Sequence, residues 1–319
     1  MPAMKAAFSH IAVFGRPNTE GLAAPVSAIL QTIAKTLPKA RVSLETQTAR
    51  AAGPLSGPPA QTADLSALAQ TADLAVVLGG DGTLLGVARQ LAPFKIPVVG
   101  INQGRLGFMT DLDIAQLDQQ LPPILLGHGV PEDRSMLDVS VMRKSEDGQN
   151  WQPVFQATAL NDAVISRGAV SRMVELDVFV DGHYMQTLRA DGLIVATPTG
   201  STAYALSAFG SVLHPRLQGI TLVPVAPQAL SSRPIVLPWP VQVTVMVNDG
   251  AGTELHCDMQ ALTSLRDGDR IVIHPSAHLV RLLHPKDYDY FSTLRRKLHW
   301  SANPVLVGRP DPLFPSENA

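Results

Sequence analysis

Cysteine is nearly absent from this chain of 319 residues, which contains only Cys257. A disulfide within the chain is therefore excluded, and a reducing compartment is expected. Apolar runs are also short. None approaches the length of a membrane span, and residues 1–8 lack the apolar core of a secretory signal. These absences predict a soluble, cytoplasmic protein that does not bind a membrane.

The chain also lacks an excess of charge of either sign. It has 25 Lys and Arg against 27 Asp and Glu, so its formal net charge is −2, and bulk electrostatics does not indicate nucleic acid as a partner. Two phosphate-binding motifs are missing as well. No Gly-x-Gly-x-x-Gly follows the first predicted strand, which argues against an ordinary nicotinamide dehydrogenase, and no Gly-x4-Gly-Lys-Ser/Thr P-loop is present.

The most informative stretch is a glycine-rich loop between a strand and a helix. Five apolar residues, Leu74–Leu78, predict a buried strand that runs into Gly79-Gly80-Asp81-Gly82, and the apolar spacing after this loop predicts a helix that Pro93 ends. Loops at the carboxyl ends of strands bind ligands in open α/β sheets, and glycines at a helix N-terminus suit phosphate. A carboxylate repels phosphate, so Asp81 is better suited to accept a proton from a hydroxyl or to help hold a metal ion.

The two halves of the chain have different patterns. Before about residue 130, predicted strands and helices alternate, which favours a parallel sheet with right-handed crossovers. Afterwards, period-two alternation and Asp-Gly turns recur at short intervals, as is typical of a β-sandwich. We therefore predict an α/β domain over residues 1–133, a β-rich domain over 134–285, and a helix with a proline-rich tail over 286–319. The predicted strands include 10–14, 41–44, 74–78, 96–101, 137–142, 176–180, 193–196, 241–247 and 270–273, and residues 51–61 are predicted to be a loop rich in Gly and Pro.

Two further stretches place polar residues between apolar ones. Residues 191–204 contain a short apolar strand followed by clustered hydroxyls, which suit sugar hydroxyls, an amide or phosphate oxygens. Threonine and serine also cap helices, so this stretch has a structural interpretation as well. Asn161-Asp162, between apolar strand residues, is either a turn or a pair of side chains directed into a site.

Five motifs follow one another along the chain. They are Gly79 to Gly82, residues 101–111 (INQGRLGFMTD), Asn161-Asp162, Asp191-Gly192 with residues 197–204 (TPTGSTAY), and residues 284–288 (HPKDY) followed by Phe291. In order and spacing these motifs resemble the NAD kinase family, in particular its proteobacterial members. The resemblance covers nearly the whole chain.

This resemblance implies transfer of the γ-phosphate of ATP to the 2′-hydroxyl of the adenosine ribose of NAD, which gives NADP. A divalent metal ion, magnesium, would accompany the ATP. Asp81 matches the residue regarded as the general base, and Gly79, Gly80 and Gly82 would bind phosphates. A carboxylate suits that role because phosphoryl transfer needs one group that orients or deprotonates the nucleophile.

The resemblance also assigns residues to the dinucleotide. Phe108 matches a position near the adenine. Asn161 and Asp162 match an Asn-Glu pair on the ribose and nicotinamide side, and Asp is one methylene shorter than the usual Glu. Arg189 matches an arginine associated with preference for NAD over NADH. The other residues implied in binding are Arg172, Asp191, Thr199, Thr202, Ala203, Tyr204 and Gln260.

The implied fold is a Rossmann-like parallel-sheet domain, a β-sandwich-like domain that binds the dinucleotide, and a final segment that returns to the first domain. A homodimer or homotetramer is also implied, with NAD between domains and in contact with a neighbouring subunit. The sequence departs from the family pattern at Thr83, where Asn is frequent, at Phe209, where a small residue is usual, and at Gln228, where His is frequent.

Two other functions remain open from the residues alone. A lipid kinase of the diacylglycerol or sphingosine type, or a phosphofructokinase-like sugar kinase, carries the same glycine-rich loop. The hydroxyl-rich stretch and the HPKDY motif argue against both. A non-catalytic dinucleotide sensor could keep the same pocket, and the intact Asp81 argues against that function.

Overall fold

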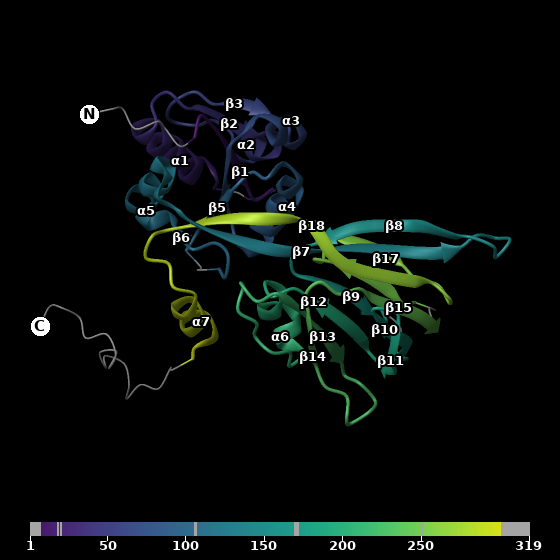
Figure 1. Ribbon diagram of the computed structural model, residues 1–319. Coiled ribbons are helices and arrows are strands. Elements are labelled where there is room, and N and C mark those ends of the chain that lie inside the picture. The colour runs from purple at the N-terminus through teal and green to yellow at the C-terminus, as the bar shows by residue number, and fades with distance from the viewer. Residues whose placement is uncertain are drawn as a thin grey trace, which may run out of the picture.

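A computed structural model of the chain describes residues 8–17, 19, 21–104, 107–168, 172–249 and 252–300. An α/β half and a β-rich half share one long mixed sheet, and a second sheet packs against this sheet in the β-rich half (Figure 1). The predicted fold class, an α/β parallel-sheet domain followed by a mostly β domain, is confirmed.

The α/β half has parallel strands with helices on both faces. The alternate residues of β1 point to opposite cores: Ile11 and Val13 pack with helices α1 and α5, whereas Ala12 and Phe14 pack with α3 and α4. The predicted strand 74–78 is β4, and the segment predicted as a loop at 51–61 contains the end of α2 and the start of β3. The elements are β1 His10–Gly15, α1 Ala23–Thr36, β2 Arg41–Glu45, α2 Thr46–Ala52, β3 Gln61–Ala63, α3 Leu65–Thr71, β4 Leu74–Leu78, α4 Asp81–Leu91, β5 Val98–Asn102, β6 Leu112–Asp113 and α5 Leu117–Pro123.

In the β-rich half two sheets enclose an apolar core. The residues of β12 alternate between that core and a smaller cluster beneath α6, which explains the continuous apolar run of this strand. The elements are β7 Val130–Lys144, β8 Trp151–Ala159, β9 Asp162–Ser166, β10 Val174–Val180, β11 His183–Ala190, β12 Gly192–Ala196, α6 Tyr204–Ser207, β13 Gly219–Val225, β14 Ile235–Pro238, β15 Val243–Asp249, β16 Glu254–Cys257, β17 Ala261–Ser264, β18 Arg270–His284 and α7 Tyr290–Leu298. The second sheet has the order β14-β13-β12-β9-β16-β17.

Two long strands, β7 and β18, connect the halves. They pair antiparallel along their length, from Arg270 opposite Met142 to His284 opposite Val130. At one end β18 pairs with β15, and at the other it joins the parallel sheet beside β5 (Figure 1). The predicted boundary between residues 133 and 134 therefore lies inside a continuous strand.

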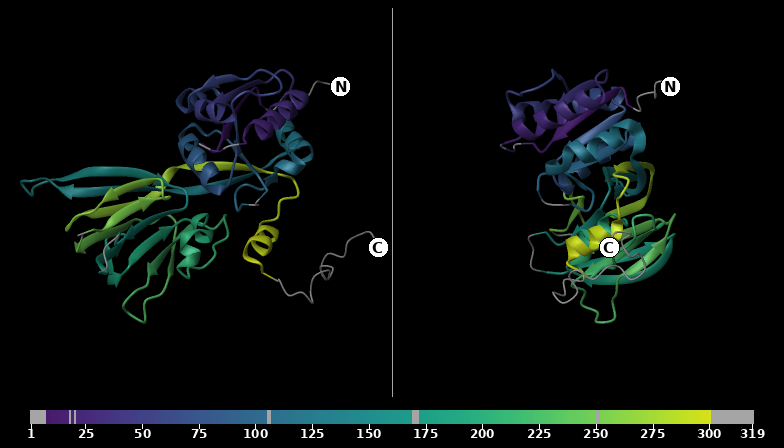
Figure 2. Two further views of the ribbon diagram at one scale, coloured as in Figure 1. Left: turned by 180° about the vertical axis from the view of Figure 1, so that it is seen from behind. Right: turned by 90° about the vertical axis from the view of Figure 1, so that its left-hand side faces the viewer.

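The final helix lies beneath the α/β half and beside the β-rich half (Figure 2). The ring of His214 contacts Tyr290 and Phe291 of α7, with ring centroids 5.0 and 5.9 Å apart. The helix predicted within residues 288–300 is thus present as α7, between the two halves. Like every other helix of the described residues, it is not long and apolar enough to span a membrane.

Candidate functional site

Asp81 joins the two glycine-bearing loops of the α/β half. β4 and β5 are neighbouring parallel strands, so the loops at their carboxyl ends meet at one edge of the sheet. The carboxylate of Asp81, at the start of α4, accepts hydrogen bonds from the backbone N–H groups of Phe108, Met109 and Thr110, at 2.7, 3.0 and 3.1 Å. The Thr110 hydroxyl donates a further bond at 3.3 Å. These donors fix the orientation of the carboxylate.

Asp258 holds the turn between β8 and β9, here called the Asn161 turn (residues 160–162). Its carboxylate accepts hydrogen bonds from the backbone N–H groups of Leu160, Asn161 and Asp162, at 2.8, 2.7 and 3.2 Å. Burial raises the pKa of Asp258, although these bonds and Arg89 act in the opposite direction. The side chain of Asp258, the residue that follows the adjacent strand β16, therefore fixes the Asn161 turn.

Arg89 and Gln260 connect α4 with the β-rich half. The Arg89 guanidinium donates to the Thr158 carbonyl at 2.9 Å and to the Gln260 side chain at 3.1 Å, and lies 3.8 Å from the Asp258 carboxylate. Gln260 in turn donates to the Gly82 carbonyl at 3.2 Å. Asp81 and the Asn161 turn come from different halves, and these bonds hold them in a fixed relative position.

The hydroxyl-rich stretch after β12 folds against the Asn161 turn. The Thr197 hydroxyl donates to a carbonyl of that turn at 2.6 Å, and the Ser201 hydroxyl donates to the Pro198 carbonyl at 2.6 Å. Gly200 packs so closely against the turn that an added Cβ would overlap with the backbone carbonyl of Asn161. The Thr202 hydroxyl also donates within the loop, to the Thr199 carbonyl at 3.2 Å, and the residues Thr199 and Thr202 line a cavity.

This cavity, of about 150 Å³, lies where the two halves meet and is here called the interdomain cavity. Six residues predicted from the sequence line it together: Asp81, Phe108, Asn161, Thr199, Thr202 and Ala203. Its other lining residues, which sequence reasoning missed, are Met109, Arg134, Pro198, Pro215 and Tyr290.

Two polar atoms of the residues that line the interdomain cavity are buried without a protein partner. Oδ1 of Asn161 and the Nη2 nitrogen of Arg134 are inaccessible to solvent and form no hydrogen bond with any described residue. Such groups cost free energy unless they are paired. An unpaired acceptor and an unpaired cationic donor in one cavity suit a ligand that carries a hydroxyl and an anionic group.

A second cavity, of about 340 Å³, borders the start of α4 and is here called the outer cavity. The glycine-rich loop contributes Asp81 to the interdomain cavity and Gly82 to the outer one. The other residues that line the outer cavity are Phe14, Gly15, Pro17, Glu45, Gln47, Leu65, Thr83, Gly86, Val87, Gln90 and Gln260. One loop therefore borders two separate spaces.

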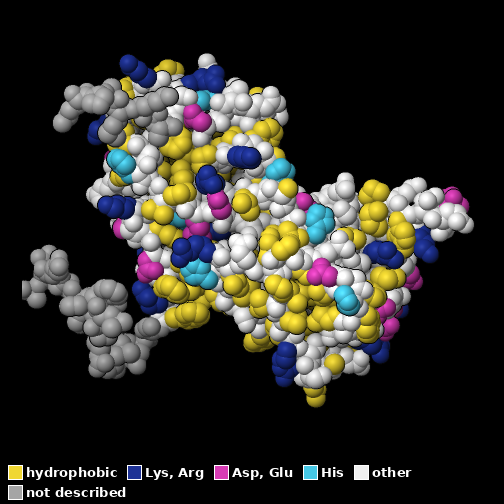
Figure 3. Space-filling model, in the orientation of Figure 1, with side chains coloured by type: hydrophobic (Ala, Val, Ile, Leu, Met, Phe, Trp, Pro, Cys, Tyr) yellow, Lys and Arg dark blue, Asp and Glu magenta, His cyan; other side chains and the backbone are white. Residues whose placement is uncertain are grey.

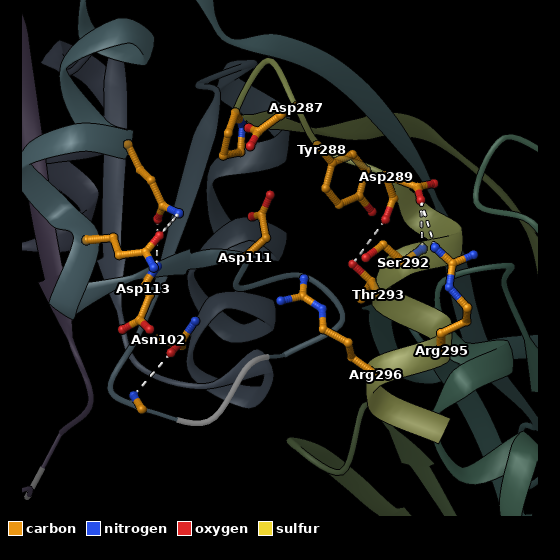
Figure 4. Close-up of a pocket in the computed structure, with 14 residues that line it drawn as sticks. Asn102, Asp111, Asp113, Asp287, Tyr288, Asp289, Ser292, Thr293, Arg295 and Arg296 are labelled. Carbon is orange, nitrogen blue, oxygen red and sulfur yellow. Dashed lines mark hydrogen bonds and ion pairs between the residues drawn. The ribbon is translucent and has the colours of Figure 1, made fainter. Parts of the chain in front are cut away.

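A third cavity, of about 540 Å³, lies between the loop after β5 and α7 (Figure 4). Asp111 and Asp113 line it on the side of the loop, and Asp289 and Arg296 on the side of the helix (Figure 4). Asp289 caps α7 by accepting from two backbone N–H groups. This cavity is larger than the interdomain cavity, but none of its described lining residues is among the predicted site residues. The interdomain cavity, by contrast, is lined by six of them.

Several predicted residues lie outside the interdomain cavity. Tyr204 is 43% exposed at the start of α6. Arg172, Arg189 and Asp191 form ion pairs within the β-rich half, with Asp249 at 2.5 Å, Glu175 at 3.4 Å and Arg167 at 3.2 Å respectively. In the described part of the chain, none of these side chains reaches the cavity.

Asp162 is the predicted site residue with the most unusual environment. It is 3% exposed and is not among the residues that line the interdomain cavity. Burial, together with the nearby Asp258, raises the pKa of Asp162 from 3.8 to about 7. Asp162 therefore keeps its proton in the folded protein up to about pH 7, whereas in the unfolded chain it loses this proton near pH 3.8.

We expect Asp162→Asn to change how stability depends on pH. Because the folded pKa is raised, the wild type loses stability as pH rises from about 4 to about 7, by up to about 4 kcal/mol, and the variant does not. The difference in melting temperature, variant minus wild type, should therefore increase between about pH 4 and about pH 7 and stay constant at higher pH. Thermal unfolding measured from pH 4 to 8 checks this, and a constant difference would contradict it.

Two family domains match most of the chain. The ATP-NAD kinase N-terminal domain matches residues 29–128, and the ATP-NAD kinase C-terminal domain matches residues 160–284. Curated proteins named NAD kinase from Paraburkholderia phytofirmans and Cupriavidus pinatubonensis are each 48% identical to this chain; the matches cover 93% and 96% of it and 95% and 97% of theirs. The chain belongs to the NAD kinase family.

Solved structures of NAD and NADH kinases are also similar to it. Yeast NADH kinase complexed with NADH has a TM-score of 0.82 at 24% identity, over 92% of this chain and 88% of that one. An NAD kinase from Archaeoglobus fulgidus in complex with ATP has a TM-score of 0.69 at 26% identity, over 91% of this chain and 98% of that one. The two matched NAD kinase domains supply different walls of the interdomain cavity: Asp81 and Phe108 belong to the first, and Asn161 and Thr199 to the second.

Proposed function

We propose that the chain transfers the γ-phosphoryl group of ATP to the 2′-hydroxyl of the adenosine ribose of NAD, giving NADP and ADP. Membership of the NAD kinase family supports this reaction. The observation that assigns it to particular residues is the interdomain cavity, where the fixed carboxylate of Asp81 and the unpaired amide oxygen of Asn161 lie together.

In this proposal Asp81 acts as the general base. The bond between the γ-phosphorus and the β–γ bridging oxygen breaks while a bond forms to the 2′-oxygen, and the hydroxyl proton passes to the Asp81 carboxylate. The electron pair of the broken bond leaves with ADP. Oδ1 of Asn161 accepts a hydrogen bond from a ribose hydroxyl, and the walls of the cavity are formed by Thr199, Thr202 and Ala203.

We assign Phe108 to the adenine end of the acceptor. Its backbone N–H is tied to Asp81, and the ammonium of Lys297 on α7 lies 5.5 Å from the centroid of its ring. An aromatic ring held in this way offers a face on which a base can stack. The adenine would then lie close to the ribose that Asp81 contacts.

The phosphates of the donor are assigned to Gly79, Gly80 and Gly82 at the start of α4. The backbone N–H groups at a helix N-terminus favour anions. The outer cavity, which Gly82 lines, has a volume of about 340 Å³, and we assign the rest of the nucleotide to it. The related Archaeoglobus kinase was solved in complex with ATP, which supports ATP as the donor here.

Magnesium is proposed to arrive with ATP. Among the residues that the structure describes, no three or more His, Cys, Asp or Glu side chains are grouped to hold a metal ion. Mg²⁺ is commonly held by one or two carboxylates together with substrate phosphates. The donor set therefore fits an ion that ATP carries, with few ligands from the protein.

We also propose self-association to a homodimer or homotetramer. Large apolar side chains are exposed on the β-rich half: Phe209 is 92% exposed, Leu230 91% and Met259 71%. Hydrophobic side chains gather over this half in Figure 3. Phe209, the bulky residue at a usually small position, thus points to solvent in the single chain. Burial of such side chains favours an interface between copies.

Arg189 is proposed to act on a dinucleotide bound by a neighbouring subunit, because it lies outside the cavity of its own chain. Arg189→Ala should lower the ratio of kcat/KM for NAD over NADH by about tenfold, the effect of one lost charge-assisted hydrogen bond. Steady-state kinetics with both dinucleotides check this. Glu175→Gln, which removes only the partner of Arg189, is the control, and an unchanged ratio in Arg189→Ala would rule out the role.

A substrate comparison tests the proposed function. Purified protein with Mg-ATP is assayed with NAD, diacylglycerol and fructose 6-phosphate, and NADP is measured with an NADP-specific dehydrogenase. We expect only NAD to be phosphorylated. Turnover of the lipid or the sugar would identify a different kinase, and binding of NAD without NADP formation would identify a sensor.

A further inference from the structure

Arg134 is a buried cation in the interdomain cavity. It lies on β7, opposite Val280 of β18, where these long strands pass between the halves. It is 2% exposed, yet it lines the same cavity as Asp81 and Asn161. A cation is seldom this buried unless other groups compensate its charge.

The hydrogen-bonding capacity of Arg134 is only partly used. Its Nη1 donates to the Thr199 hydroxyl at 3.3 Å. Its Nε lies 2.8 Å from Oε1 of Glu132, as an ion pair without hydrogen-bond geometry. Nη2 has no hydrogen-bond partner among the described residues. One end of the guanidinium is thus held by protein, and the unpaired donor Nη2 belongs to a residue that lines the cavity.

Glu132 shares its charge between Arg134 and a second cation. His284 lies 3.3 Å from the other oxygen of Glu132 and 2.9 Å from the carboxylate of Asp111. Burial lowers the pKa of His284, but the hydrogen bond to Asp111 and the close contact with Glu132 outweigh it and raise the pKa overall. The side chains of Arg134, Glu132, His284 and Asp111 contact one another in this order and are here called the row. Glu132 thus contacts Arg134 through one carboxylate oxygen and His284 through the other.

The row is packed against the segment that leads into α7. The Tyr288 ring stacks on His284, with centroids 3.9 Å apart and an angle of 9° between the rings. Two residues further on, Tyr290 lines the interdomain cavity beside Arg134. The stacked Tyr288 ring thus supports His284, which contacts the same carboxylate as Arg134.

We propose that Arg134 binds the phosphoryl group while it is transferred to the 2′-oxygen and afterwards as the 2′-phosphate of NADP, and that Glu132 and His284 are positioning residues for it. The inference rests on the proposed placement of the acceptor hydroxyl beside Asp81. The chemical class of the ligand is a phosphoryl group on a ribose oxygen.

The size and composition of the cavity favour this ligand over the pyrophosphate of NAD. At about 150 Å³ it is below the range of roughly 300–1,000 Å³ of cavities that enclose whole ligands, so it takes only part of the dinucleotide. Asp81, the proposed acceptor of the hydroxyl proton, lines the same small space as Arg134. A group within reach of both is the phosphoryl group that arrives at that hydroxyl. Arginine binds such oxygens in a bidentate manner, which lysine cannot do.

The test compares Arg134→Gln and Arg134→Lys with wild type for kcat and for the separate affinities for NAD and NADP, measured by calorimetry. Loss of one donor to the transition state costs about 10²–10³ in kcat, so we expect that fall for Gln and a smaller one for Lys. The affinity for NADP should weaken by about tenfold or more in both, while that for NAD stays within about threefold. A kcat close to wild type in both variants would overturn the proposal, and so would an equal loss of affinity for NAD and NADP.

Two further variants separate this role from structural effects. Arg281→Gln removes an arginine of the neighbouring strand that pairs with Asp133 at the surface, at 2.7 and 2.9 Å, and should leave kcat unchanged. Glu132→Gln should reduce the preference for NADP over NAD in binding without weakening NAD, and an unchanged preference would refute the positioning role. If wild type formed no NADP at all, the proposed function would fail, whereas normal turnover by both Arg134 variants would refute only this inference.

Discussion

Asp81→Asn is expected to lower kcat for NADP formation by about 10²–10⁴ while NAD still binds, because the variant lacks the proton acceptor and keeps the shape of the side chain. The Asp81 carboxylate is held by three backbone N–H groups and the Thr110 hydroxyl, so its position does not depend on the substrate. An amide can still accept the bonds made by one carboxylate oxygen. The main change is therefore chemical.

The measurement is kcat from initial rates with saturating Mg-ATP and NAD, together with the Kd for NAD from calorimetry. Thr110→Val is the matched control: it removes one hydrogen bond to the carboxylate, at 3.3 Å, and leaves the carboxylate in place. It should retain most of the activity. Near-normal kcat in Asp81→Asn would rule out the assignment of Asp81 as general base.

Gly107→Ala is expected to reduce kcat/KM by about 10²-fold, although the change adds a single methyl group. A Cβ at residue 107 would overlap with the Asp81 carboxylate and the Thr110 hydroxyl. One of these groups or the loop itself must then move. Misplacement of a catalytic group by about 1 Å is enough for a loss of this size.

The double variant with Asp81→Asn tests whether this loss acts through Asp81. If it does, Gly107→Ala costs little once the carboxylate is absent, so the two effects are strongly non-additive. Gly129→Ala is the control, because its Cβ would meet only side-chain carbons of Ile124, at 3.2 and 3.5 Å, and of Leu283, at 3.4 Å, and neither residue lines the interdomain cavity. Full additivity of the two losses would show that Gly107 acts independently of Asp81.

Local patterns predicted the elements that carry the glycine-rich loop. The run of five apolar residues is β4, and α4 ends at Leu91, just before Pro93. The helix α2 was missed because it is short and polar; it is stabilised by the Glu45 side chain, which accepts from two backbone N–H groups at its start. The reach of β7 and β18 across both halves was also missed, because strand pairing between residues over a hundred positions apart leaves no local pattern.

Residues that belong to sequence motifs were predicted as site residues, whereas a site residue on a strand outside the motifs was missed. Asp81, Asn161 and Thr199 were singled out and share one cavity. Arg134 was not, because a single arginine in a polar strand segment has no motif of its own. Its importance depends on burial and on its row of partners, which extends to His284, 150 residues further along the chain.

A crystal structure of the protein with bound NAD tests the central claim most directly, because it locates the acceptor hydroxyl. We predict the adenosine 2′-oxygen within about 3.2 Å of an Asp81 carboxylate oxygen, as a general base requires. Asn161 should accept a hydrogen bond from the same ribose. A structure with the adenosine ribose outside the interdomain cavity, or with its 3′-oxygen against Asp81, would contradict the claim.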